Sequence, residues 1–340
     1  MNASHTKHWS WMGSLLLATV FGLLLWKWPA SPETPETRTT TAAPAPPETR
    51  WQRLDRSEGV QWRAVRWEQA PIIGLDAVPE RVLSQSLATD EILMELCPPG
   101  QIVGLSKAAA DPTRSHIAGV DALHPPTVEN ESTPIIGRAP SLVFGDETIS
   151  SSVRQALRKA SIPLVVLAQP HSLETVIDHI ETVGFLVGAD QATERLIARI
   201  QRKLRQAQAR RPRGARPTRA LVWANGQVPG ADTLIHQLLT RLGAHNVAAQ
   251  AGRRDWSPAG PAEVATWDPE LLIMAGPPES LDLYRRAQLE DPALQSIPAI
   301  QQGRVVVIAS PQLYSQSQHI SEFISQLGEA LYRDPVPTAL

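Results

Sequence analysis

The chain has 340 residues, of which 42% are hydrophobic and 19% are charged, so it has enough apolar surface for about two ordinary domains. Its formal net charge of −2 argues against a nucleic-acid-binding protein, because such a domain carries a basic excess. The single cysteine, Cys97, excludes an internal disulfide and any zinc or iron–sulfur site built from cysteines. Cys97 follows an apolar run, and we expect it to be a small buried residue at a helix end.

Residues 1–28 have the composition of a membrane-targeting segment. Residues 8–26 carry no formal charge, and tryptophans stand at both ends of this stretch, where their rings favour the membrane interface. Two interpretations remain open, an uncleaved signal anchor and a cleaved signal peptide. Trp28 and Pro29 disfavour cleavage near Ala30, which favours the anchor. Either way the bulk of the chain is exported to the periplasm or cell exterior, and the anchor would hold it to the inner membrane.

Residues 29–50 are rich in proline, threonine, alanine and glutamate and have no apolar period. Such a segment cannot bury enough surface to offset its ordering entropy, so it predicts an extended tether. Residues 51–78 contain three tryptophans, and we expect them to form an N-terminal extension that packs on the first lobe. No function follows from the sequence of this extension.

Residues 79–172 alternate short apolar runs with helical patterns, which indicates an α/β lobe with a parallel sheet. Thr89 is predicted to cap the first helix, whose buried stripe consists of Ile92, Leu93 and Leu96. The expected strands are 82–84, 102–105, 141–144 and 163–167, and the expected helices are 89–97 and 151–160.

The pattern restarts in residues 213–335, which predict a second α/β lobe. Its expected strands are 220–223, 271–274 and 305–308, and its expected helices are 233–242 and 317–332.

Residues 173–212 form a helical region between the two lobes. Its second half places Leu196, Ile200 and Leu204 on one face, as in a long amphipathic helix. The basic run 210–219 is interpreted as solvated surface, since no aromatic residues accompany the charges. The sequence thus predicts an α/β protein with two lobes, each with a parallel-type sheet, joined by a long bridging α-helix and preceded by an N-terminal transmembrane or signal helix.

Five segments between about residues 78 and 332 carry a family resemblance through their order and spacing. They are RVLSQSLATDEILMEL with QIVGLS, APSLVFGD, SLETVIDHIETVGFLVGADQATERLI, GADTLIHQLLTRLGAHNVAA and WSPAGPAEVATWDPELLIMAG. Together they resemble the class III periplasmic substrate-binding proteins of ABC importers for cobalamin, siderophores and haem. The resemblance implies a non-catalytic protein that needs no cofactor and whose lobes move little on ligand capture. It also implies that the protein delivers a metal chelate to an ABC permease and its ATPase.

The ligand site of an open α/β sheet lies beyond the carboxyl ends of its strands, so the strand-end loops of both lobes predict a cleft. Flat aromatic rings with a few hydrogen-bonding groups suit a large planar or chelated ligand. Trp256 is included because the resembling family places a cleft tryptophan at this position. The candidate binding residues are Ser86, Leu87, Lys107 and Asp146 from the first lobe and Trp223, Asn225, Trp256 and Tyr314 from the second.

Three of these candidates also have a plain structural interpretation. Trp223 ends a strand and fits a core position as well as a cleft wall. Tyr314 is the best-placed hydroxyl for a haem iron or a ferric chelate, but an ordinary loop tyrosine is as consistent with its position. Lys107 fits an anionic ligand or a solvated side chain equally well.

The sequence predicts no site for a bare metal ion. The strand-end loops contain no histidine and Asp146 is their only acidic residue, whereas a divalent cation needs three or four convergent ligands. We therefore expect iron or cobalt inside an organic chelator. Six histidines are scattered, and most are interpreted as surface or cap residues: His116, His124, His171, His179, His236 and His245.

In the resembling family, one exposed glutamate of each lobe docks into arginine pockets of the permease. Glu263 falls on the second-lobe position, although a carboxylate there also fits the first turn of a helix. The first-lobe position falls on Thr133, and Glu131 is the nearby candidate. This departure leaves room for a second hypothesis, a membrane-tethered binding or sensor module without a transport role. A third, an enzyme on the same scaffold, is disfavoured because the chain lacks the Gly-x-Ser-x-Gly, His-Glu-x-x-His and phosphate-loop motifs.

Overall fold

The computed structural model describes residues 51–55, 63–67, 73–119 and 125–332. The chain divides into two compact units, Met1–Pro47 and Glu48–Leu340, and all described residues belong to the second. The predicted leader and tether, residues 1–50, lie outside the described residues. Among the described helices, none combines the length and the apolar composition that a membrane span requires.

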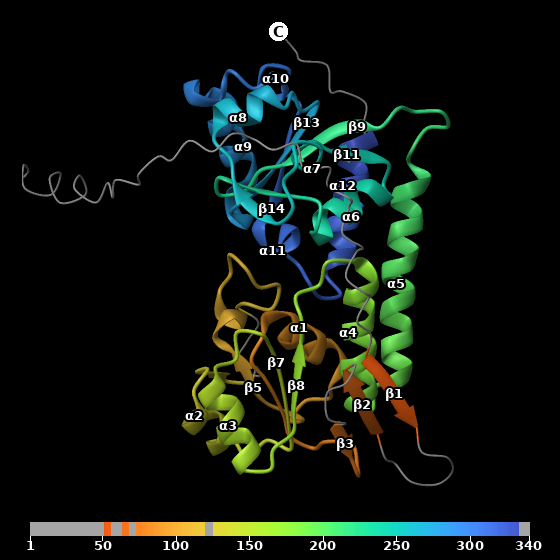
Figure 1. Cartoon of the computed structure of the whole chain (residues 1–340), viewed down its shortest axis with the longest axis vertical. Coiled ribbons are helices and arrows are strands. Elements are labelled where there is room, and N and C mark those ends of the chain that lie inside the picture. The colour runs from red at the N-terminus through yellow and green to blue at the C-terminus, as the bar shows by residue number, and fades with distance from the viewer. Residues whose placement is uncertain (1–50, 56–62, 68–72, 120–124, 333–340) are drawn as a thin grey trace, which may run out of the picture. The chain divides into compact units, whose positions relative to one another are not determined.

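A five-stranded parallel sheet with the strand order β6-β5-β4-β7-β8 forms the N-terminal lobe. Its strands β5, β7 and β8 are labelled in the lower half of Figure 1. Strands β4 and β7 pair in register, with Val82 opposite Leu142 and Ser84 opposite Phe144. These side chains are fully buried, as the strands of a sheet covered on both faces require. The strands are β4 Val82–Ser84, β5 Ile102–Ser106, β6 Thr127–Val128, β7 Leu142–Asp146 and β8 Leu164–Leu167.

Helices cover both faces of this sheet. Helix α1 buries Ile92, Leu93 and Leu96, which confirms the predicted stripe. Its N-cap is Ser86 rather than Thr89, because the helix begins three residues earlier than predicted and the hydroxyl of Ser86 accepts the N–H of Thr89 at 3.4 Å. The helices of this lobe are α1 Leu87–Leu96, α2 Ser132–Gly137, α3 Ser151–Lys159 and α4 Leu173–Leu186, with a 3₁₀ turn, η1, at Lys107–Ala110.

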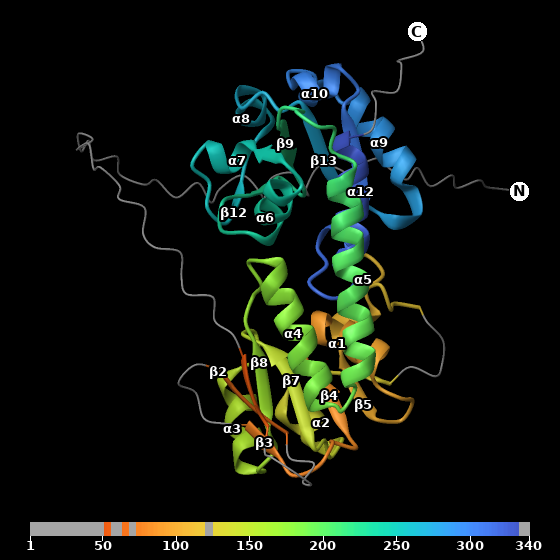
Figure 2. The same cartoon turned by 90° about the vertical axis from the view of Figure 1, so that its right-hand side faces the viewer.

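The helical region after β8 consists of two helices, α4 and α5 Asp190–Ala209, instead of one continuous rod. The chain reverses between them at Gly188, whose φ of +77° lies in the left-handed region that favours glycine. Helix α5 packs on α4 and on the C-terminal helix α12 Ile320–Tyr332, as Figures 1 and 2 show. It buries Leu196 and Ile200 on the predicted apolar face.

A second parallel sheet, with the order β11-β9-β13-β14, forms the C-terminal lobe. A separate antiparallel pair, β10 and β12, lies on the same lobe and places Trp256 opposite Pro229. The strands are β9 Thr218–Val222, β10 Gln227–Pro229, β11 Ala244–Asn246, β12 Trp256–Pro258, β13 Leu271–Gly276 and β14 Val305–Ala309. The predicted α/β class with parallel sheets is therefore confirmed.

The helices of the C-terminal lobe are mostly short. Besides α12, they are α6 Leu234–Arg241, α7 Val247–Gln250, α8 Pro261–Thr266, α9 Leu281–Glu290, α10 Pro298–Gln301 and α11 Ser310–Leu313, with 3₁₀ turns η2 Pro278–Ser280 and η3 Pro292–Leu294.

The N-terminal extension is a small antiparallel sheet of β1 Trp51–Asp55, β2 Arg63–Trp67 and β3 Ile73–Leu75. The guanidinium of Arg63 reaches the corner between α4 and α5. It donates to the backbone carbonyl of Phe185 at 2.6 Å and pairs with the carboxylate of Asp190 at 2.7 Å. The extension is thus held at the point where the two long helices meet.

One apolar core runs through both lobes. Its buried members include Phe144 of the first sheet, Ile200 of α5, Phe323 of α12 and Ile273 of the second sheet. Two smaller clusters fill the far face of each sheet. The two lobes are therefore joined by buried packing as well as by the backbone.

The close contact between α5 and α12 depends on glycine at position 328, which has no side chain. A Cβ atom on Gly328 would lie 2.7 Å from the Cβ and 3.0 Å from the Cα of Ala207, closer than two helices can tolerate. We expect Gly328→Ala to lower the free energy of unfolding by about 1–3 kcal/mol, because the helices must move apart. Urea denaturation followed by circular dichroism measures this. The control is Gly137→Ala in α2, where a Cβ meets no atom within 4 Å. The proposed packing is wrong if both variants are equally stable.

Candidate ligand-binding cleft

The carboxyl ends of both parallel sheets meet at one cleft. In the first sheet the chain leaves β4 toward β5 on one side and β7 toward β8 on the other. In the second sheet β9 and β13 separate in the same way, toward β11 and β14. Each pair leaves a crevice between its diverging loops, which is where open α/β sheets bind ligands. The topology therefore places Ser86 and Asp146 on one wall and Asn225 and Gly276 on the other.

The cleft has a volume of about 1240 Å³. Ordinary small-molecule pockets occupy roughly 300–1,000 Å³, so this cleft suits a ligand larger than a simple metabolite. A smaller hollow of about 270 Å³ adjoins it and shares Tyr314 with it. The lining residues of the cleft include Ser86, Leu87, Lys107, Arg114, Glu129, Asp146, Gln169, His179, Asn225, Tyr284 and Tyr314.

The start of α1 is held in place by buried hydroxyl groups. The hydroxyls of Ser84 and Ser86 both bond that of Thr89, at 2.6 and 2.9 Å. The next residue, Asp90, accepts the backbone N–H of Ser106 at 3.0 Å and its hydroxyl at 2.5 Å. These bonds fix the end of β5 against α1 and so position the next residue, Lys107, at the cleft.

The N-terminal wall carries paired charges. The ammonium of Lys107 lies 2.7 Å from the carboxylate of Glu129, and both side chains are more than half exposed. Asp146 accepts the N–H of Thr148 at 2.8 Å and its hydroxyl at 2.5 Å. Lys107 is thus paired with Glu129, and an anionic ligand would have to compete with Glu129 for the ammonium group.

The C-terminal wall presents the ring of Tyr314, which lies beside Trp256 of the adjoining hollow. Trp256 and Tyr314 have ring centroids 5.8 Å apart, tilted by 43°, and each is 37% exposed. The amide of Asn225 donates to the hydroxyl of Tyr314 at 3.3 Å, from a residue whose φ of +53° is uncommon outside glycine. Burial raises the pKa of the Tyr314 hydroxyl, so it is protonated at neutral pH.

Six of the eight predicted binding residues lie around the cleft in the structure, and the other two do not line it. The six are Ser86, Leu87, Lys107, Asp146, Asn225 and Tyr314. Trp256 lines the adjoining hollow instead. Trp223 does not reach the cleft: it is buried in the second-sheet core, and its indole N–H donates to the carbonyl of Ala259 at 3.0 Å. The core interpretation of Trp223 was the correct one, since its side chain points to the far face of the sheet.

Several lining residues were missed from the sequence. Arg114 comes from the segment between β5 and β6, which has no regular apolar period, and Glu129 directly follows the two-residue strand β6. Gln169 follows β8, and its position after a strand was a usable signal. Tyr284 lies on α9, a helix that the sequence patterns did not predict.

Among the described residues, one group has the composition and proximity of metal ligands. A ligand atom from each of Glu91, His116 and His319 lies within 4.8 Å of the other two. Glu91 also lines the cleft, so this group stands at its edge. His179 belongs to the six histidines of which most were interpreted as surface or cap residues; it is buried, and burial lowers its pKa to about 4.

The two glutamates considered for permease docking have different surroundings. Glu263 lies in the first turn of α8 and forms an ion pair with Arg253. Glu131 is exposed at the N-cap position of α2, two residues before Thr133. An arginine pocket on a partner would have to displace Arg253 before it could bind Glu263.

The sequence matches the periplasmic binding protein family over residues 82–311, more than half of the chain. It is 23% identical over 269 residues to a cobalamin-binding protein of Halobacterium salinarum, covering 78% of this chain and 72% of that protein. The fold is similar to the periplasmic heme-binding protein RhuT from Roseiflexus sp. RS-1, with a TM-score of 0.62, 25% identity, and coverage of 74% of this chain and 98% of that one. The heme-binding protein HutB of Vibrio cholerae gives a TM-score of 0.62 at 20% identity, with coverage of 74% and 98%.

The buried carboxyl of Asp90 makes the stability of the cleft wall depend on pH. Burial raises its pKa from 3.8 to about 6, so between these values the folded chain holds a proton that the unfolded chain has lost. Its stabilising contribution is therefore full below about pH 4 and is lost as the pH rises through about 6. We expect Asp90→Asn to raise the free energy of unfolding at pH 7.5 by up to about 3 kcal/mol, and to flatten its pH dependence between about pH 4 and 6.

Urea denaturation at several pH values measures this effect. Asp282→Asn, at an exposed position on α9, controls for the loss of one charge. If Asp90→Asn is less stable than the unmodified chain at pH 7.5, the hydrogen bonds to Ser106 outweigh the burial of the charge and the interpretation is wrong.

Proposed function

Because the chain belongs to the periplasmic binding protein family, we propose that it captures a metal chelate, either haem, cobalamin or a ferric siderophore, in the cleft between its lobes. The family and fold are those of solute-binding proteins, which act outside the cytoplasm and hold a ligand without transforming it. The observation that carries the choice of ligand is the pairing of a cleft of about 1240 Å³ with exposed aromatic rings.

The chemistry of the cleft supports a chelate. A large planar ligand gains from flat apolar contact, which Trp256 and Tyr314 supply, and from a few polar groups that fix its orientation. Asn225, Lys107 and Asp146 supply those groups on opposite walls. Two kinds of relative, one named for cobalamin and one for heme, favour the same ligand class.

Titration of the full-length chain with hemin, cyanocobalamin and ferrichrome tests this proposal. We expect at least one ligand to quench tryptophan fluorescence, because the ring of Trp256 lies beside that of Tyr314, which lines the cleft. Trp256→Ala and Tyr314→Phe should weaken that ligand by about tenfold each, which corresponds to about 1.4 kcal/mol.

The matched control is Tyr332→Phe, whose hydroxyl donates to the carbonyl of Leu242 away from the cleft. It should leave the affinity unchanged. If none of the three ligands perturbs the fluorescence, the proposed ligand class is wrong. Normal binding by Trp256→Ala would remove that residue from the site.

The proposed role includes delivery to an ABC permease and its ATPase, with the protein anchored to the inner membrane through its N-terminal apolar segment. Glu131 and Glu263 are the proposed docking residues, through charge-assisted contacts that orient the complex. In cells that depend on this chain for uptake of the identified chelate, we expect Glu131→Lys with Glu263→Lys to reduce uptake several-fold while affinity for the chelate is kept. Glu329→Lys, on the exposed side of α12, is the control.

A second role, a tethered sensor that binds the chelate without transport, is favoured by Thr133 at the first-lobe docking position and by the ion pair of Glu263 with Arg253. Deletion of the chain separates the two roles. Loss of chelate uptake supports delivery, whereas unchanged uptake with intact binding supports the sensor.

A further inference from the structure

We propose that Glu91, His116 and His319 form a binding site for one divalent transition-metal ion of the zinc class at the junction of the two lobes. The proposal goes beyond the proposed function and does not depend on it, because the ion would be a resident of the protein and not the captured ligand. Two histidines and one carboxylate, with a water in the fourth position, are a ligand set that zinc uses in proteins.

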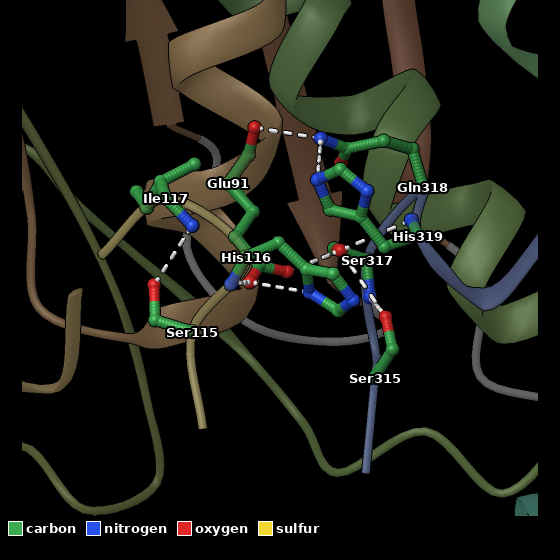
Figure 3. Close-up of polar contacts among 8 residues, drawn as sticks. All are labelled: Glu91, Ser115, His116, Ile117, Ser315, Ser317, Gln318 and His319. Carbon is green, nitrogen blue, oxygen red and sulfur yellow. Dashed lines mark hydrogen bonds and ion pairs between the residues drawn. The ribbon is translucent and has the colours of Figure 1, made fainter. Parts of the chain in front are cut away.

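The three ligands come from segments far apart in the sequence. Glu91 lies on α1, His116 on the loop after η1, and His319 immediately before α12. Figure 3 shows the carboxylate of Glu91 and the two imidazole rings facing one another in a small space. Because His319 directly precedes α12 and Glu91 lies on α1, an ion held here would join α12 to the first lobe.

The carboxylate of Glu91 is fixed and ionised. Its Oε1 accepts the backbone N–H of His116 at 2.9 Å and lies 3.0 Å from Nδ1 of the same residue, while its Oε2 accepts the hydroxyl of Ser317 at 2.5 Å. Burial alone would raise the pKa of Glu91, but these hydrogen bonds outweigh it and hold the pKa below its usual value. Ser317 would remain as an outer partner that orients the carboxylate, a common feature of metal sites.

The histidines have unused ligand capacity. The Nε2 atom of His116 is buried and has no hydrogen-bond partner in the described part of the chain, which is a costly arrangement for a polar atom. The Nε2 atom of His319 has a contact of 3.3 Å with the amide of Gln318.

The two rings are stacked, with centroids 4.1 Å apart and an angle of 13° between their planes. A nitrogen lone pair lies in the plane of its ring, so two stacked rings cannot share an ion until one of them turns. Turning the ring of His319 breaks the stack and the contact with Gln318. Glu91 gives up its bond to Nδ1 of His116, so that its carboxylate and an imidazole nitrogen of His116 can both face the ion, and keeps its bonds to the backbone N–H of His116 and the hydroxyl of Ser317. Metal capture thus needs only a small rearrangement of side chains around the carboxylate of Glu91, which is already held in place.

Titration of the metal-stripped full-length chain with Zn²⁺ and Co²⁺ tests the proposal, without any chelate ligand present. We expect one Zn²⁺ per chain by calorimetry, a visible absorption band typical of four-coordinate Co²⁺, and a higher thermal midpoint with Zn²⁺ because three distant segments become joined. His116→Gln and His319→Gln should each weaken Zn²⁺ by more than the roughly 10–100-fold that loss of an outer partner costs. The exposed His245 provides the control variant His245→Gln, which should bind as the unmodified chain does.

The proposal is overturned if no Zn²⁺ binds in a one-to-one ratio, or if His319→Gln keeps full affinity. His319 is only half-buried, so its variant serves even if Glu91→Gln fails to fold, and circular dichroism without metal checks the fold of each variant. Hemin titration of His319→Gln separates the two proposals. Normal hemin binding with lost Zn²⁺ binding supports both, whereas Zn²⁺ binding by a chain that takes no chelate supports this site and refutes the proposed ligand.

Discussion

The close approach of α12 to α5 at Gly328 and Ala207 is the interaction on which the cleft depends. Helix α5 continues from the N-terminal lobe, and α12 closes the C-terminal lobe, so their contact sets the distance between the two sheets. A parallel sheet can bind a ligand only at the edge where its carboxyl ends lie, and two such edges make a cleft only if they are held at a suitable separation. The positions of the strand-end residues in the cleft therefore depend on the packing of α5 against α12, two helices that do not line the cleft.

The fold was largely predictable because its signals are local. Apolar runs of three to five residues marked all the central strands of both sheets, and periodic patterns marked α1, α3, α6 and α12. The predictions were wrong where a boundary depended on backbone geometry. Ser86 caps α1 because the chain turns immediately after β4, and both Ser86 and Thr89 are good caps by composition. The edge strands β6, β10, β11 and β12 have two or three residues each, too few to show a period.

The site was harder to predict, for reasons that particular residues make clear. Whether a strand-end tryptophan faces the cleft or the core depends on which face of the sheet it occupies. Sequence spacing alone could not show that Trp223 lies in the core whereas Trp256 lies beside Tyr314. The group of Glu91, His116 and His319 was invisible for a different reason, since its members are joined only by tertiary packing across more than two hundred residues of sequence. Resemblance to a family indicates strand-end positions, but it does not indicate contacts between the loop after η1 and the segment before α12.

The core that passes from Phe144 through Ile200 and Phe323 to Ile273 has a consequence for how the molecule comes apart. Two lobes with separate cores can open and refold independently, each with its own melting transition. Here neither sheet can lose its packing without exposing apolar surface that belongs to the other, so the pair behaves as one cooperative unit. Proteases should find no stable half-molecule to release.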